Sequence, residues 1–207
     1  MFMSNHYIGF WAASDGLTYT TWNPSDNGGL TLSNGDLTAA GAAGASWKMV
    51  RSVSGKSTGK YYFETNVDAI ATEDEFLVGI AQAGTSLTAQ IGADANSYSF
   101  FYAPASTAIS KRNNGSNTAL TSTGTLATSD KLMVAFDAGG GNLWFGENGT
   151  WFDSGDPGAG TNAQFTGLSG TFYAAICLFS TGETGTTNFG TTAFAHSIPS
   201  GFTGWTV

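Results

Sequence analysis

The chain offers few side chains of the kinds that perform catalysis or hold metal ions. His6 and His196 are its only histidines, and neither stands at metal-ligand spacing from a carboxylate or a cysteine. A shared site would require these two histidines to meet in space, which the sequence leaves open. The triple glycine at 139–141 precedes an expected strand rather than a helix, so it does not match a phosphate-binding loop. We therefore predict no catalytic residue, no cofactor and no metal.

Acidic side chains gather in the last third of the chain. Five carboxylates follow Lys131, the last basic residue: Asp137, Glu147, Asp153, Asp156 and Glu183. They could offer oxygens to Ca²⁺, but the regular spacing of a calcium-binding loop is missing, so we interpret them as solvated turn residues on an acidic surface. Two facing carboxylates in a cleft could hydrolyse a glycoside, and the sequence leaves this open because that spacing is spatial.

The composition favours one all-β domain. Of the 207 residues only 11% are charged, while 41% are hydrophobic and 29 are glycine, a balance typical of a sandwich or barrel with many turns. A net charge of −8 argues against binding to nucleic acid or to anionic membranes, which requires clustered Lys and Arg. No stretch approaches the roughly 20 apolar residues of a membrane span, and residues 1–14 lack the basic start of a signal peptide.

Cysteine usage excludes a disulfide within the chain. Cys177 is the single cysteine, so the fold depends on its core alone. It stands inside the apolar run Phe172–Phe179, which predicts a strand buried on both faces. We therefore interpret Cys177 as a small buried hydrophobe rather than a nucleophile.

The stretch Lys131–Trp151 predicts two β-hairpins in tandem. Apolar side chains alternate with more polar ones, as in a strand that is buried on one face: Leu132, Val134 and Phe136. Turn chemistry follows at 137–142, the apolar face resumes at Leu143 and Phe145, and Asn148-Gly149 supplies a second tight turn. The wide aromatic face of such a meander must be covered by the rest of the chain.

Similar patterns predict strands along the remaining sequence, at 19–24, 30–32, 37–38, 47–53, 60–67, 76–81, 98–102, 109–112 and 172–179. Gly79 interrupts one of them, which indicates a bulge or a close backbone approach. We predict a single sandwich over 19–207 after an N-terminal arm at 1–18, with a buried core that includes Phe63, Val78, Val134, Phe136, Phe145 and Ile176.

Six segments, in order and at fitting distances, resemble one known family. They are Gly59-Lys-Tyr-Tyr-Phe-Glu64, Val78-Gly-Ile80, the 130–137 strand, Asn142-Leu-Trp-Phe-Gly-Glu-Asn-Gly149, Gly170-Thr-Phe-Tyr-Ala-Ala175 and Asn188-Phe-Gly190. Over most of Tyr19–Trp205 the chain resembles a SPRY domain, the module of B30.2-type proteins. The resemblance implies a two-sheet antiparallel β-sandwich, a concanavalin-like jelly roll, which binds protein or glycan partners through its loops and has no catalytic chemistry.

A second resemblance concerns the start of the domain. Thr21-Trp-Asn-Pro24 with Leu32-Ser-Asn-Gly35 resembles the opening of SPRY proteins encoded by bacteriophages. It implies a noncatalytic virion component made in the host cytoplasm, such as a capsid decoration (cement) or adaptor subunit that binds other virion proteins. The alternatives are a tail-fibre or adhesin module that binds a host surface glycan or protein, and a glycan-cleaving enzyme. No repetitive shaft sequence is present, which favours the decoration or adaptor role.

Aromatic residues supply the candidate partner contacts. Trp47 and Trp144 are expected in the core. Four others stand beside irregular segments, where they could anchor a partner or stack on sugar rings: Tyr98, Phe101, Tyr102 and Trp151.

The arm adds four more candidate contacts, Phe2, Tyr7, Phe10 and Trp11. We expect it to dock on a neighbouring subunit, because burying a few aromatic side chains can offset the entropy of ordering a short segment. The alternative is that it packs across its own sandwich.

Overall fold

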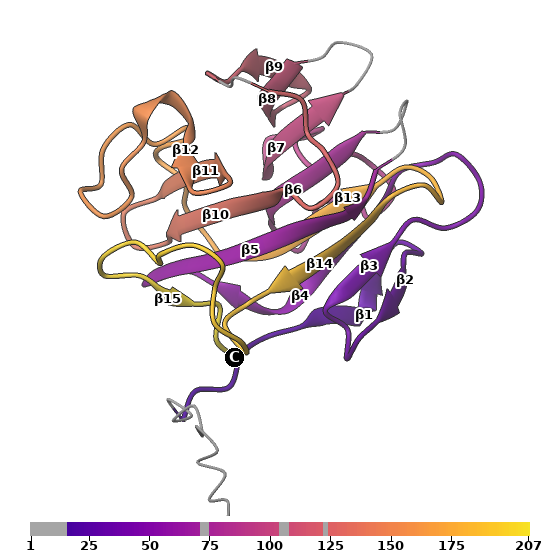
Figure 1. The fold of residues 1–207 in the computed structure, drawn as a ribbon, viewed down its shortest axis with the longest axis horizontal. Coiled ribbons are helices and arrows are strands. Elements are labelled where there is room, and N and C mark those ends of the chain that lie inside the picture. The colour runs from indigo at the N-terminus through magenta and orange to yellow at the C-terminus, as the bar shows by residue number, and fades with distance from the viewer. Residues whose placement is uncertain (1–15, 71–74, 104–107, 122–123) are drawn as a thin grey trace, which may run out of the picture.

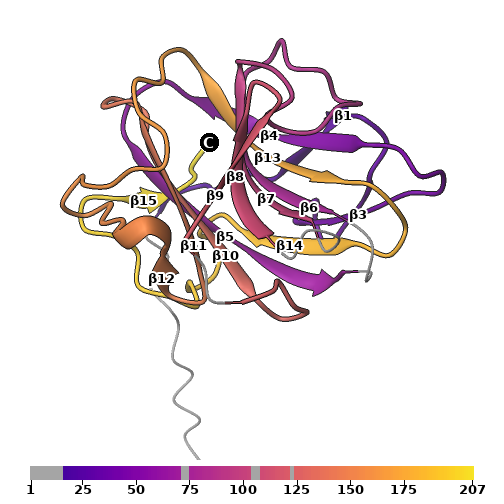
Figure 2. The ribbon, with the colours of Figure 1, turned by 90° about the horizontal axis from the view of Figure 1, so that it is seen from above.

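The computed structural model describes residues 16–70, 75–103, 108–121 and 124–207. Within these ranges the chain forms two packed sheets, which appear as two layers when Figures 1 and 2 are compared. The pairings are antiparallel except for one short strand, and the helical content is a single 3-10 turn at Phe152–Ser154. The expected all-β sandwich is therefore confirmed.

The first sheet has seven strands. Their order is β1 (Trp22–Asn27), β4 (Lys48–Lys56), β13 (Phe172–Leu178), β6 (Phe76–Ala81), β7 (Ser97–Ala103), β8 (Ala108–Asn113) and β9 (Ser116–Ala119). We had ended the first strand at Pro24, and this was wrong, because β1 runs through it to Asn27. Since β1 is an edge strand, the missing N–H of a proline costs no ladder hydrogen bond there.

The second sheet has eight strands. Their order is β12 (Thr150–Trp151), β11 (Asn142–Glu147), β10 (Lys131–Asp137), β5 (Lys60–Ala69), β14 (Thr184–Asn188), β3 (Thr38–Ala40) and β2 (Thr31–Ser33), while β15 (Thr203–Gly204) pairs parallel to β5. In Figure 1 this sheet lies toward the viewer. The predicted meander is its β10–β11–β12 part, with Asn148 and Gly149 both at positive φ in the turn.

The main core lies between the two sheets. The six side chains that we predicted to be buried are at most 1% exposed. Phe136 is typical of them: its ring packs edge-on against Phe172 of the first sheet, at 5.6 Å between centroids, and stacks on Trp205 at 6.2 Å. Aromatic pairs of this kind join the two layers and account for the 14% aromatic content.

A second apolar layer covers the outer face of the first sheet. Met49, Leu77, Phe101 and Cys177 pack there against Ile91 of the β6–β7 connection. Cys177 is thus buried as predicted, and burial raises the pKa of its thiol well above the usual range. Arg51 fastens the same connection, since its guanidinium donates to the backbone oxygens of Gln82 and Thr85 and to the Asp26 carboxylate.

We expected Glu183 on the acidic surface, and this was wrong, because Glu183 is fully buried. Its carboxylate accepts hydrogen bonds from the backbone N–H groups of Phe179 and Ser180. A short turn after β13 has unpaired amides that need an acceptor, which explains an acidic side chain in an apolar setting. In the described ranges no helix is long and apolar enough to cross a membrane.

Candidate functional site

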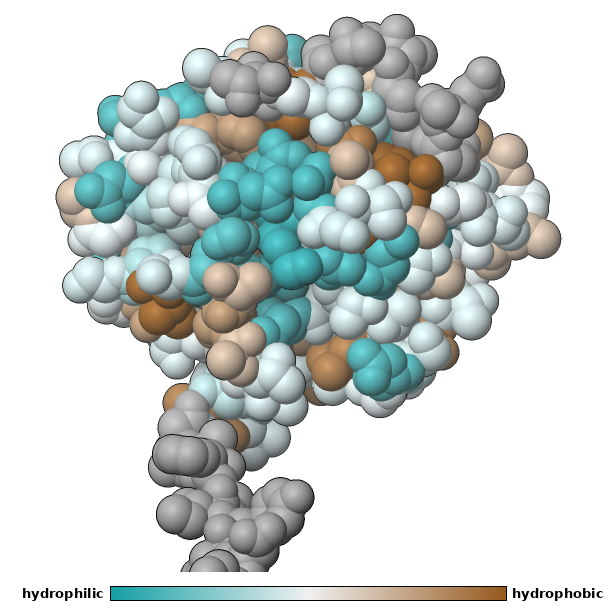
Figure 3. Space-filling model, in the orientation of Figure 1, coloured by the Kyte–Doolittle hydropathy of each residue, from teal (hydrophilic) through white to brown (hydrophobic). Residues whose placement is uncertain are grey.

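The outward face of the second sheet is divided into an apolar part and a polar part. The apolar part consists of Tyr62, Met133, Ala135 and Trp144, and it is covered by Phe202. The polar part stays open, and Figure 3 shows a hydrophilic area in the centre of this face. The open part is where a partner can reach the sheet.

We call the open part the polar track. It is made of Thr38, Thr186, Asp68, Asn66 and Lys131, from β3, β14, β5 and β10. Thr38 and Thr186 share a hydrogen bond of 2.7 Å between their hydroxyls, and Thr186 donates to Asp68 at 2.5 Å. Asn66 donates to Asp68 and accepts from the Lys131 ammonium. The track is therefore continuous across four strands.

Strand register explains the track. Along β5 the side chains alternate, so that Phe63, Thr65 and Val67 face the core while Glu64, Asn66 and Asp68 face outward. In the ladders Asn66 lies opposite both Lys131 and Thr186, and Thr186 lies opposite Thr38. Four polar residues thus form one row perpendicular to the strands, because partners in register point to the same face.

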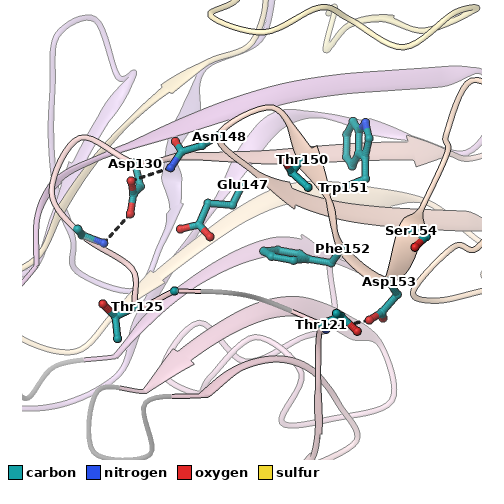
Figure 4. Close-up of a pocket in the computed structure, with 12 residues that line it drawn as sticks. Thr121, Thr125, Asp130, Glu147, Asn148, Thr150, Trp151, Phe152, Asp153 and Ser154 are labelled. Carbon is teal, nitrogen blue, oxygen red and sulfur yellow. Dashed lines mark hydrogen bonds between the residues drawn. The ribbon is translucent and has the colours of Figure 1, made fainter.

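A separate cleft lies at the β11–β12 hairpin, on the core-facing side of the second sheet, since Glu147 is the register partner of the buried Leu132 (Figure 4). The cleft has a volume of about 620 Å³ and is lined by Thr121, Gly124, Thr125, Ala127, Asp130, Glu147, Asn148, Thr150, Trp151, Phe152, Asp153 and Ser154. Asn148 lies at the rim of the cleft, where its amide oxygen accepts the backbone N–H of Lys131 at 2.9 Å and its amide donates to Asp130 at 2.7 Å. A second hollow of about 360 Å³ lies along the track beside Asn66 and Thr186.

One carboxyl group of the cleft, that of Glu147, has a raised pKa. Burial raises the pKa of Glu147 to about 7, with further contributions from the charge of Asp130 and a hydrogen bond with it. Asp130 itself is held by the Asn148 amide and by the N–H of Ala127 at 2.6 Å. Near neutral pH the Glu147 carboxyl group is therefore partly protonated, so it can both accept and donate hydrogen bonds.

Backbone geometry shapes the far wall of the cleft. Asp153 and Ser154 are consecutive non-glycine residues at positive φ, 53° and 57°. Next to this turn the Phe152 ring is buried in the core and stacks on Phe100, at 5.9 Å between ring centroids. The Asp153 carboxylate accepts a hydrogen bond from the backbone N–H of Thr121 at 2.9 Å. Such conformations persist only where the surroundings impose them, and they are frequent at binding sites.

The cleft supports binding better than catalysis. The two carboxyl groups of a glycosidase stand about 5 Å or more apart, with the sugar between them. In the cleft Asp130 accepts hydrogen bonds from the Asn148 amide and the Ala127 N–H, and Asp153 accepts one from the Thr121 N–H, so both carboxylates are already held by neighbouring groups. In the described ranges no group of three or more His, Cys, Asp or Glu side chains could hold a metal ion.

The four aromatic residues of the domain that we predicted as partner contacts differ in how exposed they are. Trp151 is partly exposed and lines the cleft. Tyr98 is partly buried against Phe165 at 5.0 Å. Phe101 and Tyr102 lie in the interior of β7 with only 5% and 6% of their surface exposed, so they do not offer the loop-edge surface that we expected.

The two tryptophans expected in the core are placed there to different extents. Trp144 is fully buried, as predicted, and Trp47 is partly buried against the outer layer of the first sheet. The arm residues Phe2, Tyr7, Phe10 and Trp11 lie outside the described residues, so their role stays a prediction.

Sequence reasoning missed the polar track. The alternation of β5 does place Glu64, Asn66 and Asp68 on one face, and that signal was available. The matching residues Thr186 and Thr38 come from strands about 120 residues later and about 30 earlier in the chain, and their register cannot be read from period-2 patterns alone.

Comparisons with known proteins agree with this architecture. The family model for the SPRY domain matches residues 60–192. The SPRY domain of human HERC1 superposes with a TM-score of 0.64 at 15% identity, over 80% of this chain and 96% of that one. The TRIM65 PSpry domain gives 0.59 at 16% identity, over 82% and 92%.

Stonustoxin shares the same fold within a longer protein. It gives a TM-score of 0.58 at 18% identity, over 82% of this chain but only 27% of the stonustoxin chain. Identities this low indicate a common fold and nothing more specific. No curated protein matches the sequence.

Proposed function

The chain belongs to the SPRY domain family, and from this membership we propose that it is a noncatalytic interaction module that binds its partner at the cleft and the polar track. SPRY domains are in general interaction modules. The observation that carries the proposal is the open polar row on the outward face of the second sheet, together with the cleft at the β11–β12 hairpin.

The arrangement of these groups supports binding. Asn, Asp and Thr side chains are short, and here they are already held by hydrogen bonds to one another. A partner that contacts them orders few additional rotamers, so the entropic cost of binding is small. The cleft supplies the concave shape that convergent polar groups need to select one partner.

We further propose that the module acts in a phage virion, as a capsid decoration or adaptor subunit that contacts other virion proteins. Support comes from the sequence, in the resemblance of 21–24 and 32–35 to phage-encoded SPRY proteins. The low charge and the single buried cysteine suit a subunit that assembles in the host cytoplasm and depends on packing alone. A tail-fibre or adhesin role is the alternative, and the polar track favours it where the partner is a glycan.

The test combines particle analysis with matched variants. Virus particles from the source of the gene are purified, and the chain is sought in them by mass spectrometry and located by electron cryo-microscopy. We expect the chain in the particle, with the cleft in contact with another virion protein.

The variants test the cleft itself. The double variant Asp130→Asn/Glu147→Gln should lower incorporation into particles, whereas Asn117→Ala on the exposed strand β9 of the first sheet should not. A chain found only outside particles refutes the virion role. Equal incorporation of both variants refutes the role of the cleft.

A further inference from the structure

We propose that the polar track is a binding groove for a neutral polysaccharide, which lies across the strands on the outward face of the second sheet. This inference rests on the proposed function, since it takes the same face as the binding surface. It adds the chemical class of the partner, which follows from the groups along the groove, from the sheet face on which they stand and from their charge.

The geometry is that of an extended, shallow groove. Thr38, Thr186, Asn66 and Lys131 stand in register on four neighbouring strands, so the row is roughly 14 Å long at the usual strand spacing. A hollow of about 360 Å³ adjoins the row and is lined by Asn66, Lys131 and Thr186 among others. A linear chain of several sugar rings fits such a row better than a single small molecule does.

The groups along the groove match sugar hydroxyls. Each hydroxyl both donates and accepts a hydrogen bond, so it needs a surface that offers both. The track offers a carboxylate acceptor at Asp68, an amide at Asn66, and hydroxyls at Thr38 and Thr186. On the same outward face the partly exposed ring of Trp151, edge-on to Tyr62 at 6.2 Å, adds an aromatic surface of the kind on which sugar rings pack.

A peptide fits the same face poorly. Extended peptides bind to sheets mainly by adding a strand to a free edge. Here β5 is paired on one side with β10 and on the other with β14, so its backbone groups are already used.

The negative charge of the protein favours a neutral polysaccharide over an acidic one. The track carries the carboxylate of Asp68, and the chain has a net charge of −8. The cation of the track, Lys131, already donates to Asn66 at 2.5 Å. A polysaccharide of uronic acids would be repelled by Asp68 and by the net negative charge of the chain, whereas a neutral polysaccharide would not.

The experiment is affinity electrophoresis of the full chain in native gels. The gels contain dextran, a β-1,3-glucan, a galactomannan, a mannan or, as the polyanion, alginate. We expect retardation by at least one neutral polysaccharide and none by alginate. Asn66→Ala and Thr186→Val should weaken it at least tenfold while the melting temperature stays near that of the parent. The control Asn117→Ala removes an exposed amide from the first sheet and should be retarded like the parent.

Three results would overturn the inference: no retardation by any of the neutral polysaccharides, equal retardation by alginate, or unchanged retardation of folded Asn66→Ala and Thr186→Val. These outcomes are separable from a failure of the proposed function. If no polysaccharide binds but Asp130→Asn/Glu147→Gln still lowers incorporation into particles, the interaction module stands and its partner is a protein.

Discussion

Asn66 on β5 lies directly opposite Lys131 on β10, and the Lys131 ammonium donates a 2.5 Å hydrogen bond to the Asn66 side-chain oxygen. Because the two residues are register partners in an antiparallel ladder, their side chains emerge on the same face. The pair extends the track from β5 to β10. Removing either side chain would interrupt the row of hydrogen bonds between these two strands.

The first prediction concerns the core at Phe136. This ring is 1% exposed and packs against Phe172 and Trp205, so Phe136→Ala leaves a cavity between the sheets. The free energy of unfolding should fall by about 3–5 kcal/mol. Urea denaturation measures it, with the partly buried Phe165→Ala as a milder comparison. A Phe136→Ala variant that unfolds like the parent would refute this account of the core.

The second prediction concerns pH. The folded state raises the pKa of Glu147 from 4.5 to about 7, so between these values it holds a proton that the unfolded state has lost. The free energy of unfolding therefore falls as the pH rises through this window. Glu147→Gln cannot ionise and should remove that part of the fall, which makes it more stable than the parent above about pH 7.

The measurement for Glu147 is the urea midpoint across the same pH range. Asp36→Asn is the control, because Asp36 lies in the β2–β3 turn and asparagine also tolerates its positive φ of 62°. This control should keep the slope of the parent. Parallel curves for Glu147→Gln and the parent would mean that the carboxyl group titrates normally.

The third prediction concerns the close approach at Gly79, which the interrupted strand pattern had indicated. A Cβ added there would lie 2.0 Å from the backbone oxygen of Tyr98 on β7. Gly79→Ala should therefore push β6 and β7 apart and cost about 3 kcal/mol, at the upper end of overpacking. Gly84→Ala is the matched control, since nothing lies within 4 Å of its added carbon. Equal melting temperatures for both variants would contradict the prediction.

The fourth prediction concerns the ion pair of Arg51 with Asp26, at 2.7 Å. The Arg51 side chain is 4% exposed and that of Asp26 is 27% exposed. Asp26→Ala leaves a buried guanidinium without its carboxylate, which should cost about 2–3 kcal/mol, less than for a fully buried pair. Adding Arg51→Met should recover part of the loss. If the double variant is instead no more stable than Asp26→Ala, the charge is not the cause.

The fifth prediction concerns the N-terminal arm. If its aromatic residues dock on a neighbouring subunit, deleting Met1–Trp11 should leave the melting temperature of the isolated chain unchanged and prevent its assembly. Differential scanning calorimetry and particle incorporation measure the two effects. A sharp drop in the melting temperature would show that the arm belongs to the subunit's own fold.

Local patterns predicted the strands well, because the alternation that defines a strand is contained in a few neighbouring residues. Lys60–Ala69, Phe76–Ala81 and the β10–β11 hairpin were expected within two or three residues of their observed bounds. The exceptions have local causes. Pro24 is tolerated at an edge, and Glu183 serves as an acceptor for turn amides.

The amino-acid sequence by itself determined the all-β class, the SPRY family and the burial of Phe63, Val134 and Phe136, because turn chemistry and period-2 burial are local properties. Only the tertiary structure decided the candidate site. The polar track combines β3, β5, β10 and β14, and the cleft brings Glu147 to Asp130 through the β10–β11 pairing. Such neighbours are set by strand order and register, which depend on how the whole hydrophobic surface is buried and therefore on contacts between distant residues.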